Sequence, residues 1–171
     1  MTEEKKGRGR PKGAPNKPKL ELITKREELL PHADTYEIMC QANIVAQKEP
    51  ELAAQGLQVF NDRNAAVRPT LMWAFNDDIV STLPEGTTPF NANSAPGTDL
   101  TESSLKFEAR KFKYFTTEQI SPLRRETMWI ELLESIAPME AKMIDLVKDG
   151  HWPFKNITKD IAQMAFPNDI K

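Results

Sequence analysis

Apolar residues recur along most of this chain at spacings of three and four, the period of a helix with one buried face. The clearest example follows Ser121 and Pro122, which suit the N-cap and the first turn of a helix. Its apolar side chains stand at positions i, i+3, i+4 and i+7: Trp129, Leu132, Leu133 and Ile136. The pattern predicts an amphipathic helix that buries this face in a core.

Similar patterns with start and stop residues predict the other helices. Asp34 with Glu37 three residues later resembles a capping box, and Pro50 suits a first helical turn. Gly150 and Pro167 are stop signals. The expected helices cover residues 20–30, 34–47, 51–60, 65–76 (or from Pro69), 100–112 with Thr101 as a candidate cap, 138–149 and 158–166, with one further turn at 79–83.

Signals for strands are weak, since no Asn-Gly or Asp-Gly pair is flanked by alternating apolar residues. We therefore expect an all-α fold, a compact bundle of about seven or eight short helices over residues 20–171. Residues 84–98 contain three Pro and two Gly, so they form a long loop rather than a regular element. Such a loop is either functional or a packed Ω-loop, and Phe90 favours packing.

The formal charge of −2 for the whole chain conceals a strong asymmetry. Residues 1–19 hold seven Lys or Arg against two Glu, a charge of +5, whereas residues 20–171 hold 16 basic and 23 acidic residues, a charge of −7. The first 19 residues contain three Gly and three Pro and no Leu, Ile, Val or aromatic residue. We expect this basic arm to be disordered alone and to have a nucleic-acid partner.

Within the arm, Arg8-Gly9-Arg10-Pro11-Lys12 resembles the core of an AT-hook. Gly9 lets the backbone lie close to the floor of the minor groove, while Arg8 and Arg10 extend along it. A narrow A·T groove concentrates negative potential, whereas the amino group of a G·C pair obstructs the backbone. Pro11 keeps the segment extended. Further basic residues would contact phosphates: Lys5, Lys6, Lys12, Lys17 and Lys19.

The AT-hook core occurs once, so two alternatives stay open for the arm. A basic tail can bind any polyanion, RNA included, or can have no nucleic-acid role. The run from Gly9 to Lys19 is also similar to the N-terminal arms of many phage-encoded proteins. No apolar segment follows the charges, so the arm is not expected to be a secretory signal.

A second basic cluster lies inside the helical region. Arg110, Lys111 and Lys113 alternate with aromatic residues at 112, 114 and 115, an arrangement that can bind single strands by stacking and phosphate contact. The alternative is a helix end that buries Phe112 and Phe115 and leaves the charges in solvent.

Two further arginines, Arg124 and Arg125, stand at the start of the predicted helix after Pro122. This is a poor place for positive charge, because the N-terminus of a helix is itself positive. Either Glu126 offsets the charge or an acidic partner uses it.

Signs of catalysis are missing from the sequence. Cys40 is the single cysteine, so no intramolecular disulfide can form, and we expect it to be a small, half-buried apolar residue. His32 and His151 lack the spacing of zinc ligands, and no phosphate loop or Gly-x-Ser-x-Gly motif occurs. The sequence contains no run of 18 apolar residues, so we expect no membrane span. We expect no enzyme activity, no cofactor and no metal.

Several segments carry a family resemblance. The longer ones are WAFNDDI at 73–79, LPEG at 83–86, FEARKF at 107–112 and RRETMWIELLE at 124–134, and short ones lie at 89–90, 141–142, 148–149, 157–159 and 165–167. They are similar to an uncharacterised protein family of large contractile-tailed, cyanophage-like phages, over roughly residues 65–167. The resemblance implies phage origin and a helical fold, and it carries no catalytic residue. The basic arm lies outside the matched region.

Together these observations predict a phage-encoded, DNA-associated accessory protein in the cytoplasm of an infected bacterial host. Its arm would bind the minor groove of A·T-rich duplex DNA, and its helical body would bind an unidentified protein partner. The alternative is a protein-interaction or virion-associated component with no specific DNA role.

Overall fold

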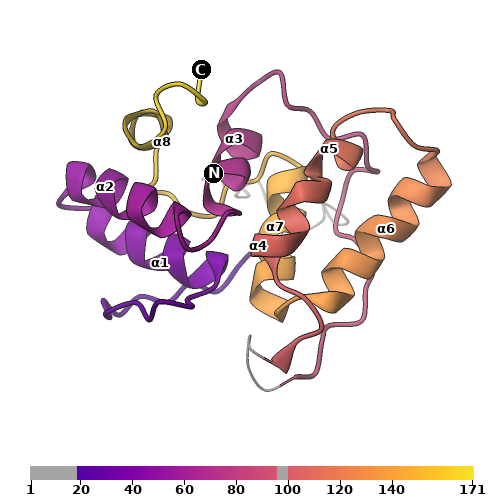
Figure 1. The fold of residues 1–171 in the computed structure, drawn as a ribbon, viewed down its shortest axis with the longest axis horizontal. Helices are drawn as coiled ribbons and strands as arrows, with labels where there is room; N and C mark the ends of the chain where they lie inside the picture. Colours follow the sequence, from indigo (N-terminus) through magenta and orange to yellow (C-terminus); the bar gives the residue numbers. More distant parts are fainter. Residues whose placement is uncertain (1–18, 96–99) are drawn as a thin grey trace, which may run out of the picture.

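The computed structural model describes residues 19–95 and 100–171, and this part of the chain contains helices and no strand. The expected all-α fold is confirmed. In chain order the elements are α1 (Thr35–Ala46), α2 (Pro50–Asn61), α3 (Val67–Phe75), α4 (Leu105–Glu108), the 3-10 helix η2 (Ala109–Lys111), α5 (Phe112–Phe115), α6 (Pro122–Ser135), α7 (Pro138–Lys148) and α8 (Lys159–Ala165) (Figure 1).

Side-chain caps set where three of the helices begin, as predicted. The Asp34 carboxylate accepts a hydrogen bond from the backbone N–H of Glu37 at 2.8 Å and opens α1. Ser121 and Thr158 cap α6 and α8 in the same way, each accepting from the N–H three residues on. Gly150, with φ of +74°, follows the end of α7, where a left-handed backbone favours glycine.

Helix α7 lies at the centre of the bundle. It packs against α1, α3 and α6, and most of its side chains are buried. Figure 1 shows α1, α2 and α8 on one side of α7, and α5 and α6 on the other. Because α7 is enclosed on several sides, even its polar residues Glu140, Asp145 and Lys148 are buried.

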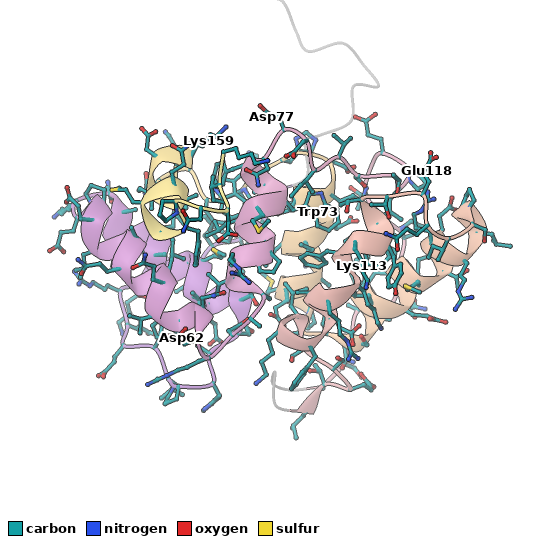
Figure 2. The ribbon with its side chains drawn as sticks, turned by 45° about the horizontal axis from the view of Figure 1, so that its top comes forward. Asp62, Trp73, Asp77, Lys113, Glu118 and Lys159 are labelled. Atoms are coloured by element: carbon teal, nitrogen blue, oxygen red, sulfur yellow. The ribbon has the colours of Figure 1, made fainter. Side chains whose placement is uncertain are left out.

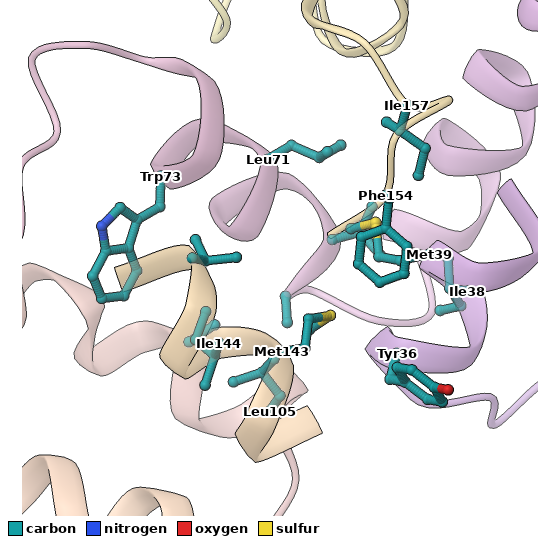
Figure 3. Close-up of a cluster of buried hydrophobic side chains, with 14 of the residues drawn as sticks. Tyr36, Ile38, Met39, Leu71, Trp73, Leu105, Met143, Ile144, Phe154 and Ile157 are labelled. Atoms are coloured by element: carbon teal, nitrogen blue, oxygen red, sulfur yellow. The ribbon is translucent and has the colours of Figure 1, made fainter. Parts of the chain in front are cut away.

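The core joins side chains from distant parts of the chain. In Figure 3, Met39 of α1, Trp73 of α3, Leu105 of α4 and Met143 of α7 surround a common interior. Aromatic rings continue it towards α6: Trp129 packs edge-to-face with Trp73 (5.9 Å between ring centroids) and with Phe115 (4.9 Å). The predicted apolar face of the α6 helix, residues 129, 132, 133 and 136, is fully buried.

The prediction of a helix over residues 20–30 is wrong, because this segment is irregular. Its backbone groups pair with side chains of α1 instead of with each other. The Tyr36 hydroxyl donates to the Glu21 carbonyl, and the Gln41 amide donates to the Lys25 carbonyl and accepts from the Glu27 N–H. Three of the four apolar residues that suggested a helix, Leu20, Ile23 and Leu29, still pack against the core, as does Leu22. The fourth, Leu30, is 61% exposed.

The predicted helical turn at 79–83 is also wrong. Thr82 pairs through its N–H and hydroxyl with the Phe115 carbonyl (2.8 and 2.9 Å), which draws the chain away from helical geometry. Of the three apolar residues in this segment, Leu83 is buried, Ile79 is half-buried and Val80 is exposed.

The fifth predicted helix starts later than expected. Residues 101–104 are not helical, and the helical run begins at Leu105, with Ser104 rather than Thr101 in the N-cap position. The Ser103 N–H donates to the carbonyl of Ser135 at the end of α6, which fixes an extended approach to α4.

The sequence suggested that the charge of Arg125 is offset by Glu126 or used by an acidic partner. The structure shows other contacts for this side chain. It is buried, and its guanidinium donates to the carbonyls of Thr82 (2.9 Å) and Ile120 (3.0 Å). These loop carbonyls have no helical partner, so a buried arginine satisfies them.

The presence of Phe90 predicted that the loop beginning at Pro84 packs against the body. The described part of this loop, residues 84–95, does so. The Asp145 carboxylate accepts from the N–H and hydroxyl of Thr88, and Lys148 donates to the carbonyls of Pro84 and Gly86, both at 2.9 Å. Phe90 itself contacts the core. Buried charges on α7 therefore hold this loop in place.

Candidate functional site

Eight of the nine predicted DNA-binding residues of the arm lie outside the described residues: Lys5, Lys6, Arg8, Gly9, Arg10, Pro11, Lys12 and Lys17. The ninth, Lys19, is exposed. It lies at the edge of a shallow depression that Leu20, His151 and Trp152 also line. The first described residue of the chain is therefore on the surface, beside the segment that follows α7.

The structure separates the residues of the second basic cluster. Phe112 and Phe115 are buried in the core, so their faces are closed to bases. The Lys111 ammonium lies 2.6 Å from the Glu108 carboxylate, while Arg110 and Lys113 are exposed. Figure 2 shows Lys113 on the half of the molecule opposite Asp62 and Lys159. The Lys113 ammonium lies 5.0 Å from the ring centroid of half-buried Tyr114.

Sequence reasoning missed two neighbours on the same surface. Lys106 and Phe107 precede Arg110 by four and three residues, the spacing that places side chains on one helix face. Phe107 is 61% exposed, and the Lys106 ammonium lies 5.2 Å from its ring centroid. Helical spacing from Arg110 was the signal that could have revealed both.

A polar pocket of about 440 Å³ adjoins this surface, beside the N-termini of α1 and α4. Its lining includes Lys106, Phe107 and Arg110 together with Asn64, Ser104 and Glu140. The Asn64 side-chain amide forms two hydrogen bonds with the Thr35 hydroxyl, one as acceptor and one as donor. The pocket thus combines carboxylates, hydroxyls and cations.

Glu140 joins three helices at the base of this pocket. Its carboxylate accepts hydrogen bonds from the backbone N–H of Thr35 (3.0 Å) and from that of Leu105 (3.4 Å), the first residues of α1 and α4. Complete burial, reinforced by the nearby charge of Asp34, raises the pKa of Glu140 to about 7. Its role in the geometry is to cap two helices from a third.

The pKa of Glu108, which lines the same pocket, shifts in the opposite direction from that of Glu140. Burial alone would raise its pKa, but hydrogen bonds from Lys111 and Ser103 outweigh burial and lower the pKa. Glu108 is therefore an ionised partner of Lys111, which removes Lys111 from the set of free cations on this surface.

An apolar groove of about 570 Å³ lies between residues 26–29 and helices α1 and α2. Its apolar lining includes Leu29, Ile38, Val45, Leu52, Leu57 and Phe60. Leu52 of α2 is 43% exposed. Nothing lies within 4 Å of the position that a Cβ would take at Gly56, so the wall is open there. Glu27 and Glu28 stand at its rim with Arg26, which pairs with Glu49 at 3.5 Å.

Other candidate chemistry is weak in the described residues. Cys40 is buried, and this burial raises the pKa of its thiol, so it behaves as a small apolar residue. Within residues 19–95 and 100–171, no three His, Cys, Asp or Glu side chains are grouped to hold a metal ion. None of the helices described there is long and apolar enough to cross a bilayer.

Comparison with known proteins gives one match. A family model described as a family of unknown function, DUF6433, matches residues 44–153. No curated protein and no solved structure matches the chain. The matched region runs from the last residues of α1 to just beyond α7 and excludes residues 1–43.

Proposed function

For a chain that belongs to DUF6433, a family of unknown function, we propose the role of a phage-encoded, DNA-associated accessory protein without enzyme activity. Residues 1–19 bind the minor groove of A·T-rich duplex DNA, and the helical body binds a protein partner. The protein acts in the cytoplasm of the infected bacterial host. Its effect is to raise the concentration of the partner beside DNA.

The observation that carries this proposal is the charge asymmetry together with the Arg8-Gly9-Arg10 core. A segment of charge +5 precedes a body of charge −7, so the body repels duplex DNA while the arm attracts it. Gly between two Arg suits close approach to a narrow groove. The family match covers the body and not the arm, so the support for DNA binding comes from the arm's own residues.

The apolar groove supports the second half of the proposal. Its exposed Leu52 and its open wall at Gly56 leave apolar surface that a partner could cover. The rim carries Glu27 and Glu28, and the body as a whole is acidic. These features fit a partner segment that presents apolar side chains to the groove and basic residues to its rim.

Replacing Arg8 and Arg10 together with alanine is expected to weaken binding to an A·T-rich duplex at least about tenfold. The reason is the loss of both side chains that enter the groove. Fluorescence anisotropy over a range of salt concentrations measures the affinity and the number of phosphate contacts.

The matched control for this pair is Lys48→Ala with Lys155→Ala, which removes two exposed charges from the body. It should leave duplex affinity nearly unchanged. Equal losses in the two double variants would contradict the arm proposal. Equal affinity of the natural chain for a G·C-rich duplex would reduce it to polyanion binding.

Leu52→Glu is expected to reduce recovery of the protein partner at least about tenfold, because hot-spot contacts in such grooves dominate affinity. The measurement is purification of the full chain from infected cells after nuclease treatment, with bound proteins quantified by mass spectrometry. Leu123→Glu, at a residue of α6 that is 77% exposed and far from the groove lining, is the control. A partner that Leu52→Glu retains does not use this groove.

A further inference from the structure

Burial divides the helical run from α4 to α5 into two faces. One face packs into the core and consists of Leu105, Glu108, Ala109, Phe112 and Phe115. The other face is open or half-open to solvent and consists of Lys106, Phe107, Arg110, Lys113 and Tyr114, which we call the basic–aromatic face. The members of this face are spaced by three, four and seven residues, so they follow one side of the helical run.

The basic–aromatic face concentrates positive charge on an acidic body. Four of the 16 cations in residues 20–171 fall between 106 and 113, and Glu108 is the one acidic residue among them. Glu108 is buried and paired with Lys111, so Lys106, Arg110 and Lys113 are not neutralised from within the run. These three cations give the face local positive charge that can attract a polyanion to an otherwise acidic body.

The face also exposes an aromatic ring that folding does not explain. All eight phenylalanines lie in the described residues, and Phe107 is the one that is more exposed than buried. A cation lies beside each ring of the face, Lys106 by Phe107 and Lys113 by Tyr114. Aromatic rings with adjacent cations are the arrangement that stacks unpaired bases and contacts their phosphates.

The polar pocket beside Phe107 has the chemistry to accept a base. The Ser104 hydroxyl in this pocket is buried and has no hydrogen-bond partner among the described residues. Asp34, Glu102 and Glu140 also line the pocket and would repel a phosphate, whereas a neutral base meets no such repulsion. Phosphates would therefore follow the outer cations while one base turns inward.

We propose that the basic–aromatic face binds single-stranded DNA, with one base stacked on Phe107 and the phosphates on Lys106, Arg110 and Lys113. The helical run supplies the contact, independently of the arm. The choice of DNA over RNA rests on the proposed function, since a strand opened near an arm-bound duplex would be present at high local concentration.

The test uses the full chain with a labelled single strand of about 12 nucleotides, a length within the usual range for such surfaces. Saturating unlabelled A·T-rich duplex occupies the arm, and fluorescence anisotropy reports binding of the single strand. Phe107→Ala is expected to weaken that binding at least about fivefold. Leu123→Ala removes another exposed apolar side chain and should leave the affinity unchanged.

A charge-matched pair of triple variants tests the phosphate contacts. Replacing Lys106, Arg110 and Lys113 with glutamine should reduce the slope of log affinity against log salt by about 2. The same change at three exposed lysines elsewhere, Lys48, Lys142 and Lys155, should not alter the slope. Circular dichroism confirms that each variant keeps its helices.

Three results would overturn the proposal. Phe107→Ala could bind the single strand as tightly as the natural chain, or the duplex could displace the strand completely. An RNA of the same sequence could bind more tightly than the DNA strand, and Phe107→Ala could weaken binding of the RNA but not of the DNA. That result would assign the face to RNA. Loss of duplex binding in the Arg8 and Arg10 variant concerns the arm and leaves this test intact.

Discussion

Replacing Lys148 with methionine is expected to destabilise the protein by about 3–5 kcal/mol, the usual cost of removing one partner from a buried ion pair. The Lys148 ammonium is fully buried and lies 2.7 Å from Asp149 and 4.0 Å from Asp145. It also donates to two carbonyls of the loop that begins at Pro84. Methionine fills a similar volume but leaves these acceptors without a donor, so the loop loses its attachment to α7.

Denaturant unfolding followed by circular dichroism measures this change in the free energy of unfolding. Lys142→Met is the matched control, since Lys142 is an exposed residue of the same helix. It should change stability by less than about 0.5 kcal/mol. Similar effects of the two substitutions would mean that the buried contacts of Lys148 contribute nothing.

Glu140→Ala is expected to destabilise the protein by about 2–4 kcal/mol at pH 5, because it leaves the N–H groups of Thr35 and Leu105 buried without an acceptor. The loss should shrink as the pH rises. The folded pKa of Glu140, about 7, lies above its ordinary value near 4.5, so the folded state holds a proton that the unfolded state has lost between these values. Stability from this group is therefore fully present below about pH 4.5 and falls until about pH 7.

Denaturant unfolding of the natural chain and of Glu140→Ala, at pH 5 and at pH 8, measures the loss of stability at each pH. Glu131→Ala, at an exposed residue of α6, serves as the control and should have a small effect at both values. A difference between Glu140→Ala and the natural chain that grows with pH would contradict the raised pKa. Asp34, which raises that pKa, is present in all of these proteins.

Much of the fold could be predicted because its signals are local. Asp34, Ser121 and Thr158 cap helices through bonds to residues three positions away, and Gly150 ends a helix through its own backbone angle. The segment from residue 20 to 30 could not be predicted in this way. Its backbone partners are Tyr36 and Gln41, and only the packed structure brings these side chains to it.

The candidate surfaces were predicted unevenly for the same reason. The basic arm is visible in the sequence because charge and the Arg8-Gly9-Arg10 order need no fold. For the second basic cluster the sequence left two alternatives open, and the burial of Phe112 and Phe115 agrees with a helix end that buries these two rings. The exposure of Phe107 was not predicted. Which side of a short helix is buried depends on its neighbours, and the break into α4, η2 and α5 weakened the helical period that could have shown it.

The burial of Arg125 and Lys148 was equally hidden from the sequence. Both are long cations on helices, and such residues are usually exposed. Each instead donates to loop carbonyls, of Thr82 and Ile120 for Arg125 and of Pro84 and Gly86 for Lys148. The unpaired carbonyls that require these cations exist only after the loops have packed.

The most direct test of the central claim is a titration of the isotope-labelled full chain with an A·T-rich duplex, followed by NMR amide shifts. Binding through the arm predicts large shifts at Arg8, Gly9 and Arg10, with the amides of α1 to α8 almost unchanged. Shifts confined to the helices, with those three amides unaffected, would contradict it.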